Sequence, residues 1–301
     1  MNDELGIFFL QALEKMVEEV GRKRLVFFVA GRTGWGKSST VNSLVGKVVS
    51  KVSDYEPETA DVTGFEFEMN GVKAIIFDTP GLRDGKGNDE TYIELMRSKV
   101  EKPDSMLYVS RLDETRQEDD RQVIKIISSA LGERVWEYTV IVFTFANNVK
   151  PSQYQTKLDA KTKIIRELIA DHISDKEVAY QIPVVAIDND SDTTPDGKKW
   201  LGDLVTALVE RVSKEGTIAL LYMLTDSVRK GRIILNRKQK AIIRRKFVNA
   251  VLQSAGTLMG IGITVAGLIN APIIVGFAGG GIVGTLIGAW LSRYDDRDDD
   301  E

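Results

Sequence analysis

The sequence predicts an α/β fold in which a mainly parallel sheet carries a glycine-rich loop at the end of its first strand. Three observations predict this fold. The octapeptide Gly31–Ser38 has the spacing G-x-x-x-x-G-K-S, with an apolar run at Arg24–Ala30 before it and a helical pattern through Val45 after it. From there to residue 213, apolar runs alternate with amphipathic stretches. Such alternation is typical of parallel strands joined by helices that cover both faces of a sheet.

The first segment, residues 1–21, is predicted to be an amphipathic helix rather than a signal peptide. Its start is acidic, and apolar residues recur at helical spacing from Leu5 to Val20. The chain of 301 residues has a net charge of −4 and no cysteine. Disulfides, thiolate metal sites and cysteine nucleophiles are therefore excluded. The single histidine, His172, lies on a polar helix end and receives no chemical role.

The loop Gly31–Ser38 is expected to cradle the phosphates of a nucleoside triphosphate. Gly31 and Gly36 let the backbone curl so that N–H groups point at the β-phosphate, and the following helix N-terminus favours an anion. Lys37 reaches the β/γ oxygens, and the Ser38 hydroxyl binds Mg²⁺. The other residues here that we expect to contact the nucleotide are Arg32, Thr33, Gly34, Trp35 and Ser39.

Two apolar runs, 65–69 and 72–77, flank Asn70-Gly71 and predict a β-hairpin. The second run leads into Asp78-Thr-Pro-Gly81. An aspartate at the end of a buried strand beside a phosphate loop is placed to hold Mg²⁺ through water, and Gly81 offers an N–H to a γ-phosphate. Later strands are predicted at 106–109, 138–143 and 182–187, and helices at 118–131, 153–172 and 200–213.

The carboxy-terminal third has the composition of a membrane attachment. Residues 216–246 are predicted to form a basic amphipathic helix, and 229–246 hold nine basic residues and no acidic one. Residues 247–292 are 46 residues without a charge, long enough for two membrane crossings with a turn at Asn270–Pro272. Glycines recur there every four residues, which lets helices approach closely in lipid. An acidic tail, 293–301, follows.

Other interpretations of this third stay open. A single span near 273–291 would place the tail across the membrane. The glycine-rich segment could instead pack against the nucleotide domain or in an oligomer. The basic run could bind nucleic acid, but the adjoining apolar stretch favours a membrane, so no nucleic-acid partner is expected.

Three stretches of the chain resemble one group of GTPases. Gly31–Gly46, Asp78–Leu82 and Tyr108–Asp113 are similar to the AIG1/Toc34 family of septin-like P-loop GTPases, which includes the GIMAP proteins and chloroplast outer-envelope import receptors. The resemblance covers residues 22–215. It implies a G domain that binds GTP or GDP with Mg²⁺ and homodimerises across its nucleotide face, often with a C-terminal membrane attachment.

Guanine recognition is expected at the ends of two strands. The usual N-K-x-D motif is absent, because the fifth strand runs into Thr144-Phe-Ala-Asn147. Toc34-like proteins also begin this segment with a threonine, and Phe145 could stack on the purine. By resemblance, Asp188 and Asn189 match an acidic residue and an asparagine that contact the base, so Asp188 is the predicted guanine-reading carboxylate. The alternative is that both are only loop residues after a strand.

Hydrolysis is expected to be slow in a monomer. Leu82 occupies the position at which small GTPases carry a water-orienting glutamine. The Thr33 side chain would crowd an arginine finger supplied by another protein. Arg111 matches the family's arginine at the dimer interface, where it would catalyse or sense the partner's nucleotide. The alternative is a surface ion pair of Arg111 with Asp113 or Glu114.

The sequence therefore predicts a membrane-anchored GTPase whose G domain faces the cytosol and switches as a homodimer. GTP and Mg²⁺ would order Thr59, or its rival Thr63, and the loop after Asp78. One alternative is a receptor GTPase in preprotein import, with the chloroplast outer envelope as its membrane. Another is a nucleotide-gated membrane scaffold with negligible hydrolysis. A protein cargo or effector would be a further partner.

Overall fold

The computed structural model describes residues 24–46, 63–69, 72–78, 89–99 and 103–260. Contacts divide the chain into a larger unit, made of Leu25–Glu68 and Lys73–Ser213, and a smaller unit whose main part begins at Lys214. Several predicted features lie outside the described residues. They are the helix at 1–21, Thr59, Gly81, Leu82, the apolar residues 261–292 and the acidic tail 293–301.

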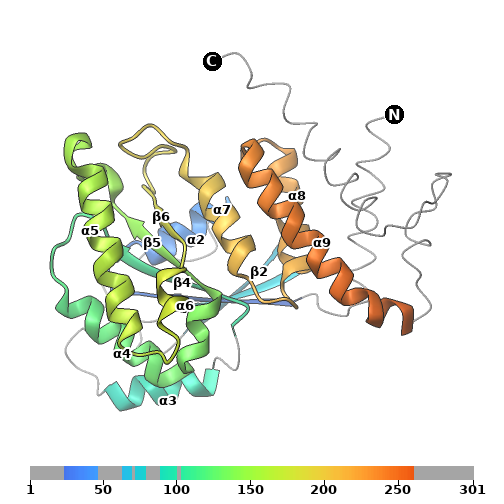
Figure 1. Ribbon diagram of the computed structural model, residues 1–301, viewed down its shortest axis with the longest axis horizontal. Helices are drawn as coiled ribbons and strands as arrows, with labels where there is room; N and C mark the ends of the chain where they lie inside the picture. The colour runs from blue at the N-terminus through green and yellow to red at the C-terminus, as the bar shows by residue number, and fades with distance from the viewer. Residues whose placement is uncertain (1–23, 47–62, 70–71, 79–88, 100–102, 261–301) are drawn as a thin grey trace. The chain divides into compact units, whose positions relative to one another are not determined.

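A six-stranded sheet forms the centre of the larger unit, with the strands in the order β2-β3-β1-β4-β5-β6 (Figure 1). The strands are β1 Arg24–Ala30, β2 Thr63–Met69, β3 Val72–Asp78, β4 Ser105–Arg111, β5 Thr139–Thr144 and β6 Val184–Ala186. Strands β1, β4, β5 and β6 pair in parallel, with Ala30 opposite Tyr108 and Arg111 opposite Thr144. The predicted α/β fold is confirmed, and the carboxyl ends of these four strands meet at one edge.

The helices described in the larger unit connect these strands. They are α2 Lys37–Val45, α3 Asp89–Lys99, α4 Glu118–Leu131, α5 Pro151–Ala170, α6 Lys176–Tyr180 and α7 Trp200–Arg211, with 3₁₀ turns η1 Glu133–Tyr138 and η2 Ala146–Asn148. The apolar pattern of the sequence does not predict α3 or α6. Helix α6 has five residues, too few to show a period, and it starts because the Asp175 carboxylate accepts a hydrogen bond from the Glu177 N–H at 3.1 Å.

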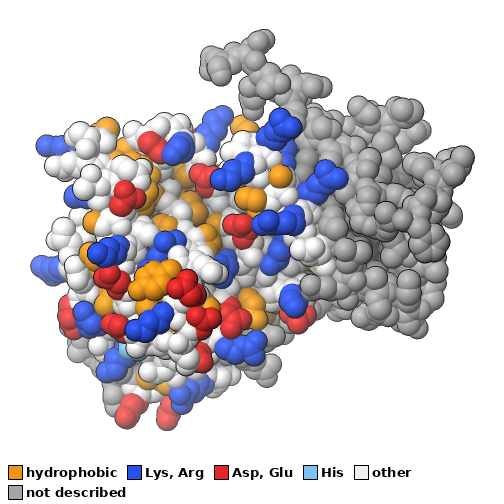
Figure 2. Space-filling view, in the orientation of Figure 1, with side chains coloured by type: hydrophobic (Ala, Val, Ile, Leu, Met, Phe, Trp, Pro, Cys, Tyr) orange, Lys and Arg blue, Asp and Glu red, His pale blue; other side chains and the backbone are white. Residues whose placement is uncertain are grey.

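Helices cover both faces of the sheet. In β1, Phe28 and Ala30 belong to a buried cluster with residues of α3, α4, α5 and α6, whereas the alternate residues Phe27 and Val29 are buried on the opposite face. On that opposite face α7 contacts β5 and β6 (Figure 1). Over the described part of the surface in Figure 2, acidic and basic side chains are interspersed, in agreement with the small net charge.

Strand β6 is shorter than the apolar run 182–187 predicts. Pro183 has no N–H to donate to the ladder, although its carbonyl oxygen still accepts a hydrogen bond from the Ile141 N–H at 3.0 Å. After β6, the Ile187 N–H donates to the Phe143 carbonyl at 2.8 Å. This bond holds the start of the next loop at the carboxyl edge of the sheet.

The smaller unit contains the helices α8 Thr217–Arg229 and α9 Arg237–Gly260. The range 216–246, expected as one basic helix, therefore holds α8, a turn and the first part of α9. The turn contains Gly231 with a φ of 71°. Helix α9 begins with a reciprocal cap, in which the Asn236 side chain accepts from the Gln239 N–H at 3.0 Å and the Gln239 side chain accepts from the Asn236 N–H at 2.8 Å.

Helix α9 runs from basic residues into the start of the apolar stretch at 247. Within the part of the chain that the structure describes, no helix combines the length and the apolar character that a membrane crossing requires.

Candidate functional site

The phosphate-binding loop lies between β1 and α2, where the sequence predicts it. Gly31 passes so close to β4 that a β-carbon on it would lie 2.3 Å from the carbonyl oxygen of Val109. Because that oxygen belongs to the backbone of a buried strand, only glycine fits at this position. The loop closes with a hydrogen bond from the Trp35 N–H to the Arg32 carbonyl at 3.2 Å. Thr33 and Gly34, at the tip of the loop, are exposed.

Helix α2 begins directly after the loop and presents its N-terminus there. Lys37 is buried, with 7% of its surface exposed, and its Nζ donates to the Arg32 carbonyl oxygen at 3.2 Å. Ser38 and Ser39, in the same first turn, are half-buried. Thr40 fixes the turn, since its hydroxyl donates to the Gly36 carbonyl at 2.8 Å. A cation on the loop, next to a helix N-terminus, suits an anion such as a phosphate.

Thr144, at the end of β5, holds the phosphate-binding loop by a hydrogen bond. Its fully buried hydroxyl lies 2.8 Å from the Trp35 carbonyl oxygen and 3.3 Å from that of Ser110. The Thr144 carbonyl oxygen accepts from the Leu112 N–H at 3.0 Å. The structure thus places this predicted base-side residue in contact with the loop and with the end of β4.

Phe145 and Arg111 lie face to face at the ends of β5 and β4. Phe145 adopts a left-handed conformation with a φ of 56°, unusual for a bulky residue. The guanidinium carbon of Arg111 lies 4.0 Å from the centre of its ring, a cation–π contact. One face of Phe145 is therefore occupied by Arg111, and a purine would have to stack on the other.

Arg111 is also held by a carboxylate. Its Nε and Nη2 donate to the two oxygens of Asp113 at 2.9 and 2.7 Å, and Asp113 accepts a third bond from Asn148 Nδ2 at 2.9 Å. Burial raises the pKa of Asp113, but the hydrogen bonds from Arg111 and Asn148 outweigh it and leave that pKa below its ordinary value. The hydrogen bonds to Asp113 raise the pKa of Arg111. The ion pair with Asp113, left open by the sequence, is thus present within one chain.

Asp188 lies in the loop after β6 and is buried, with 7% exposed. Its two carboxylate oxygens accept hydrogen bonds from the backbone N–H groups of Asn147 and Asp190, both at 3.0 Å. The Asn147 amide donates to the Thr193 carbonyl at 3.2 Å. Asp188 therefore joins the loops after β5 and β6, and each of its oxygens keeps a lone pair for a further donor.

Asn189 packs against α2 beside the phosphate loop. Its side-chain oxygen accepts from the Ser43 hydroxyl at 3.1 Å, and its Nδ2 lies 3.4 Å from the Thr40 hydroxyl. The same Nδ2 would be 3.3 Å from a β-carbon built on Gly36. The structure thus brings Asn189 to the loop and to the first turns of α2.

The loop motif alone does not predict that the Arg32 and Trp35 side chains bind acidic residues that follow β4. Arg32 pairs with Asp119 at 2.5 Å, and the Trp35 indole N–H donates to Glu114 at 3.1 Å. The signal that could have found these acids is the run of carboxylates after Arg111, which faces a loop carrying an arginine and an indole that must be satisfied.

The residues present fit Mg²⁺ bound through nucleotide phosphates. Within the described ranges, no group of three or more histidine or acidic residues could hold a metal on its own. Mg²⁺ in such sites needs only one or two protein oxygens, and Ser38 offers one at the start of α2. Asp78 ends β3, next to β1 in the sheet, and Thr63 begins β2. Thr59 lies outside the described residues.

Comparison with known proteins gives consistent matches. The AIG1 family model matches residues 23–218. Translocase of chloroplast 33 from Arabidopsis thaliana is 28% identical in an alignment of 220 residues that covers 65% of this chain and 74% of that protein. The crystal structure of Arabidopsis Toc33 in complex with GDP and Mg²⁺ has a TM-score of 0.52 at 28% identity, over 71% of this chain and 96% of that one.

A further solved structure concerns chloroplast translocon components for which dimerization is important for GTPase activity. It has a TM-score of 0.53 at 28% identity and covers 67% of this chain and 92% of its own.

Proposed function

This chain belongs to the AIG1 family, and on that premise we propose that it binds GTP and GDP with Mg²⁺ and hydrolyses GTP. The proposal rests on three loops that contact one another at the carboxyl edge of the sheet. They are the phosphate loop after β1, Thr144–Asn147 after β5 and Asp188–Asn189 after β6. The similar Toc33 structure contains GDP and Mg²⁺. We take residues 22–215 as the G domain.

In the proposed mechanism the chain binds and orients the phosphates of GTP. The loop N–H groups and Lys37 hold the β- and γ-phosphates, and Lys37 gives up its bond to the Arg32 carbonyl to do so. Ser38, Asp78 through water and Thr59 would hold Mg²⁺, which would supply positive charge beside the phosphates. Water then attacks the γ-phosphorus in line while the bond from the γ-phosphorus to the β–γ bridging oxygen breaks, so that GDP leaves and the proton of the water passes to the inorganic phosphate formed. Gly81 donates an N–H to the γ-phosphate.

Asp188 is proposed to read the base. Guanine presents N1–H and N2–H₂ donors, which adenine lacks, and the free lone pairs of a fixed carboxylate can accept both. The backbone N–H groups of Asn147 and Asp190 orient this carboxylate, which is the support the structure lends to the assignment. Phe145 would stack on the purine with the ring face opposite Arg111.

Slow hydrolysis by the monomer and a role for dimerisation are proposed together. Leu82 cannot orient water, so a second copy would supply Arg111 across the nucleotide face, as catalyst or sensor. In the single chain Arg111 is bound to Asp113 and Phe145, so it must leave these contacts to reach a partner's nucleotide. The similar translocon structure, for which dimerization matters to GTPase activity, supports this proposal.

Attachment to a membrane through 229–292, with the G domain in the cytosol, is the remaining proposal. It rests on the basic run and the uncharged segment of the sequence. The chloroplast outer envelope is the proposed membrane if the chain is a receptor GTPase in preprotein import, which the names of its chloroplast translocase relatives favour. A GIMAP-like switch and a membrane scaffold with negligible hydrolysis are the alternatives.

Lys37→Ala tests the phosphate loop. The variant should fold but lose tight binding of fluorescent GDP, because Lys37 supplies the cation that faces the phosphates. Retained affinity would contradict the assignment of the loop.

Asp188→Asn tests base recognition. If Asp188 reads guanine, the variant should lose GDP affinity and gain affinity for xanthosine diphosphate, whose carbonyl oxygen accepts from an amide. A purely structural Asp188 predicts weaker binding of both nucleotides, since only the contact between two loops would be lost.

A further inference from the structure

Two large side chains of the phosphate loop are bound to the segment that follows β4. Trp35 is 2% exposed, and its indole N–H donates to Glu114 Oε2 at 3.1 Å. Arg32 Nη1 lies 2.5 Å from Asp119 and 4.0 Å from Glu114 Oε1. The Trp35 ring also packs beside Gly31, where a β-carbon would meet it at 3.4 Å. The Glu114 carboxylate therefore contacts the loop at the Trp35 indole and lies near Arg32.

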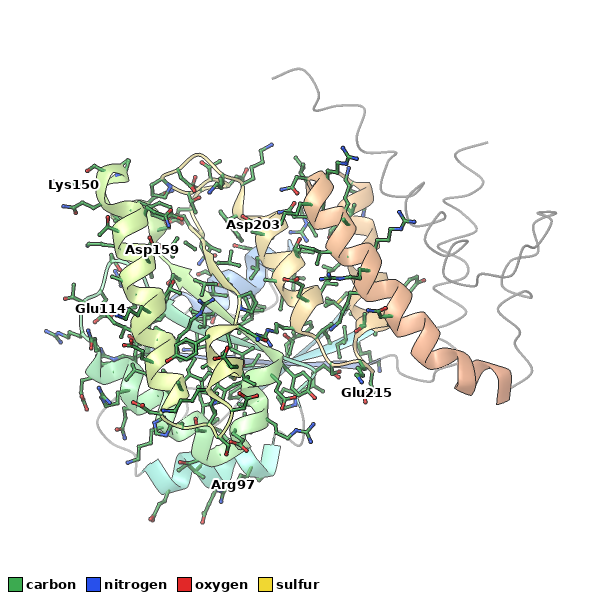
Figure 3. The ribbon with its side chains drawn as sticks, viewed as in Figure 1. Arg97, Glu114, Lys150, Asp159, Asp203 and Glu215 are labelled. Atoms are coloured by element: carbon green, nitrogen blue, oxygen red, sulfur yellow. The ribbon has the colours of Figure 1, made fainter. Side chains whose placement is uncertain are left out.

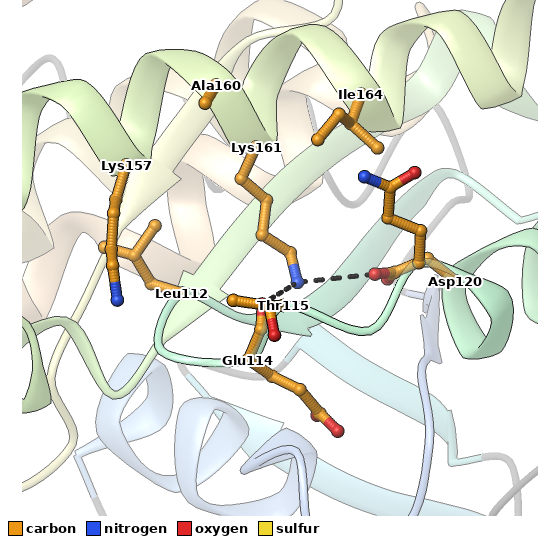
Figure 4. A pocket seen from close by; sticks show the side chains of 9 residues that line it. Leu112, Glu114, Thr115, Asp120, Lys157, Ala160, Lys161 and Ile164 are labelled. Carbon is orange, nitrogen blue, oxygen red and sulfur yellow. Dashed lines mark hydrogen bonds and ion pairs between the residues drawn. The ribbon is translucent and has the colours of Figure 1, made fainter.

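Glu114 is held from its other side by α5. Its carbonyl oxygen accepts from Lys161 Nζ at 3.2 Å, and Lys161 also pairs with Asp120 at 3.3 Å. Asp120 in turn accepts from the buried Tyr108 hydroxyl at 2.7 Å. Figure 3 labels Glu114 beside α5, and Figure 4 shows Lys161 extending from α5 toward Glu114 and Asp120. These three residues line a pocket of about 190 Å³. Glu114 thus connects the phosphate loop with a fixed point on α5.

The same segment carries the proposed dimer arginine. Arg111 ends β4, and its carboxylate partner Asp113 is the direct neighbour of Glu114 in the chain. The N–H of Leu112, which lies between Arg111 and Asp113, donates to the Thr144 carbonyl oxygen, and the Thr144 hydroxyl donates to the Trp35 carbonyl oxygen. A second set of hydrogen bonds, through Thr144 and Leu112, therefore joins the loop at Trp35 to the residues next to Arg111.

We propose that Glu114 is a positioning residue that couples occupancy of the phosphate loop to the placement of Arg111. A phosphate competes with the Arg32 carbonyl for Lys37, so the loop shifts when nucleotide binds. The indole of Trp35 passes that shift to Glu114, because a buried indole N–H has to keep an acceptor. This inference rests on the proposed GTPase function and dimer, and it adds the connection between them.

The test uses the full-length chain in mild detergent with four variants. Trp35→Phe removes the donor, Glu114→Ala removes the acceptor, their combination removes both, and Glu114→Gln keeps an oxygen for the indole. Glu118→Ala is the matched control, because the Glu118 carboxylate is exposed and lies 3.8 Å from Arg121 on the same helix. The dimer dissociation constant is measured by sedimentation in GDP and in a non-hydrolysable GTP analogue. Affinity for fluorescent GDP and urea unfolding are measured in parallel.

The ratio of the two dimer dissociation constants is expected to differ from one in the natural chain. Trp35→Phe and Glu114→Ala should each bring that ratio about fivefold closer to one. The double variant should change the ratio no more than either single variant does. Glu114→Gln and Glu118→Ala should leave the ratio unchanged. Lower unfolding stability with an unchanged ratio would overturn the proposal, as would a ratio of one in the natural chain. Failure of the natural chain to bind GDP would refute the proposed function itself.

Discussion

Replacing Gly31 by alanine is expected to weaken both the fold and nucleotide binding. The added β-carbon would lie 2.3 Å from the Val109 carbonyl oxygen, whereas ordinary contact begins at 3.4 Å, so the loop and β4 would have to separate by about 1 Å. Val109 is opposite Val142 in β5, so β4 cannot move without straining its hydrogen bonds, worth about 1 kcal/mol each. We expect a loss of about 3 kcal/mol in the free energy of unfolding.

Gly34→Ala is the control within the same loop. Gly34 has a φ of 77° but nothing within 4 Å of an added β-carbon, so only the left-handed conformation costs energy, about 1 kcal/mol. Urea unfolding and titration with fluorescent GDP compare the two variants. Gly31→Ala should be the less stable and bind GDP about tenfold more weakly than Gly34→Ala. Equal stability and affinity would mean that the approach of Gly31 to β4 does not shape the loop.

Two further predictions concern the contacts behind the site. Tyr108→Phe removes the buried hydroxyl that donates to Asp120 at 2.7 Å, and should lower the free energy of unfolding in urea by about 1–2 kcal/mol; no loss would refute the importance of this bond. Asp113 has a lowered pKa because hydrogen bonds from Arg111 and Asn148 outweigh its burial. The ionised Asp113 therefore stabilises the folded chain above its unfolded pKa of about 3.9, and this stabilisation is lost as pH falls through its pKa in the folded chain. The difference in melting temperature between the natural chain and Asp113→Asn should therefore be present at neutral pH and vanish in acid, whereas a difference independent of pH would contradict the pairing.

The phosphate loop and most of the sheet could be predicted because local chemistry determines them. The spacing from Gly31 to Ser38 specifies backbone curvature and a helix start, which need no distant partner. The runs that became β4 and β5 are apolar because both faces of a parallel strand are buried. Helix α6 was beyond prediction because its five residues depend on a cap at Asp175 and not on an apolar period.

The partners of the site side chains could not be predicted, because tertiary proximity chooses them. Trp35 and Glu114 are 79 residues apart in the chain, and Asn189 and Ser43 are 146 apart. The sequence left Arg111 with two interpretations, and the structure shows its pairing with Asp113, two residues away, together with its stacking on Phe145. Both contacts exist in one chain, so they leave the role of Arg111 toward a second copy as a prediction.

We propose that this chain hydrolyses GTP and not ATP, and that its activity depends on dimerisation. The most direct test is turnover of GTP and of ATP by the full-length chain over a wide range of protein concentration. We predict that GTP alone is hydrolysed and that the activity per molecule rises with concentration, because a second copy supplies Arg111. Equal turnover of ATP would contradict the reading of guanine by Asp188, and a rate per molecule that does not change with concentration would contradict the dimer.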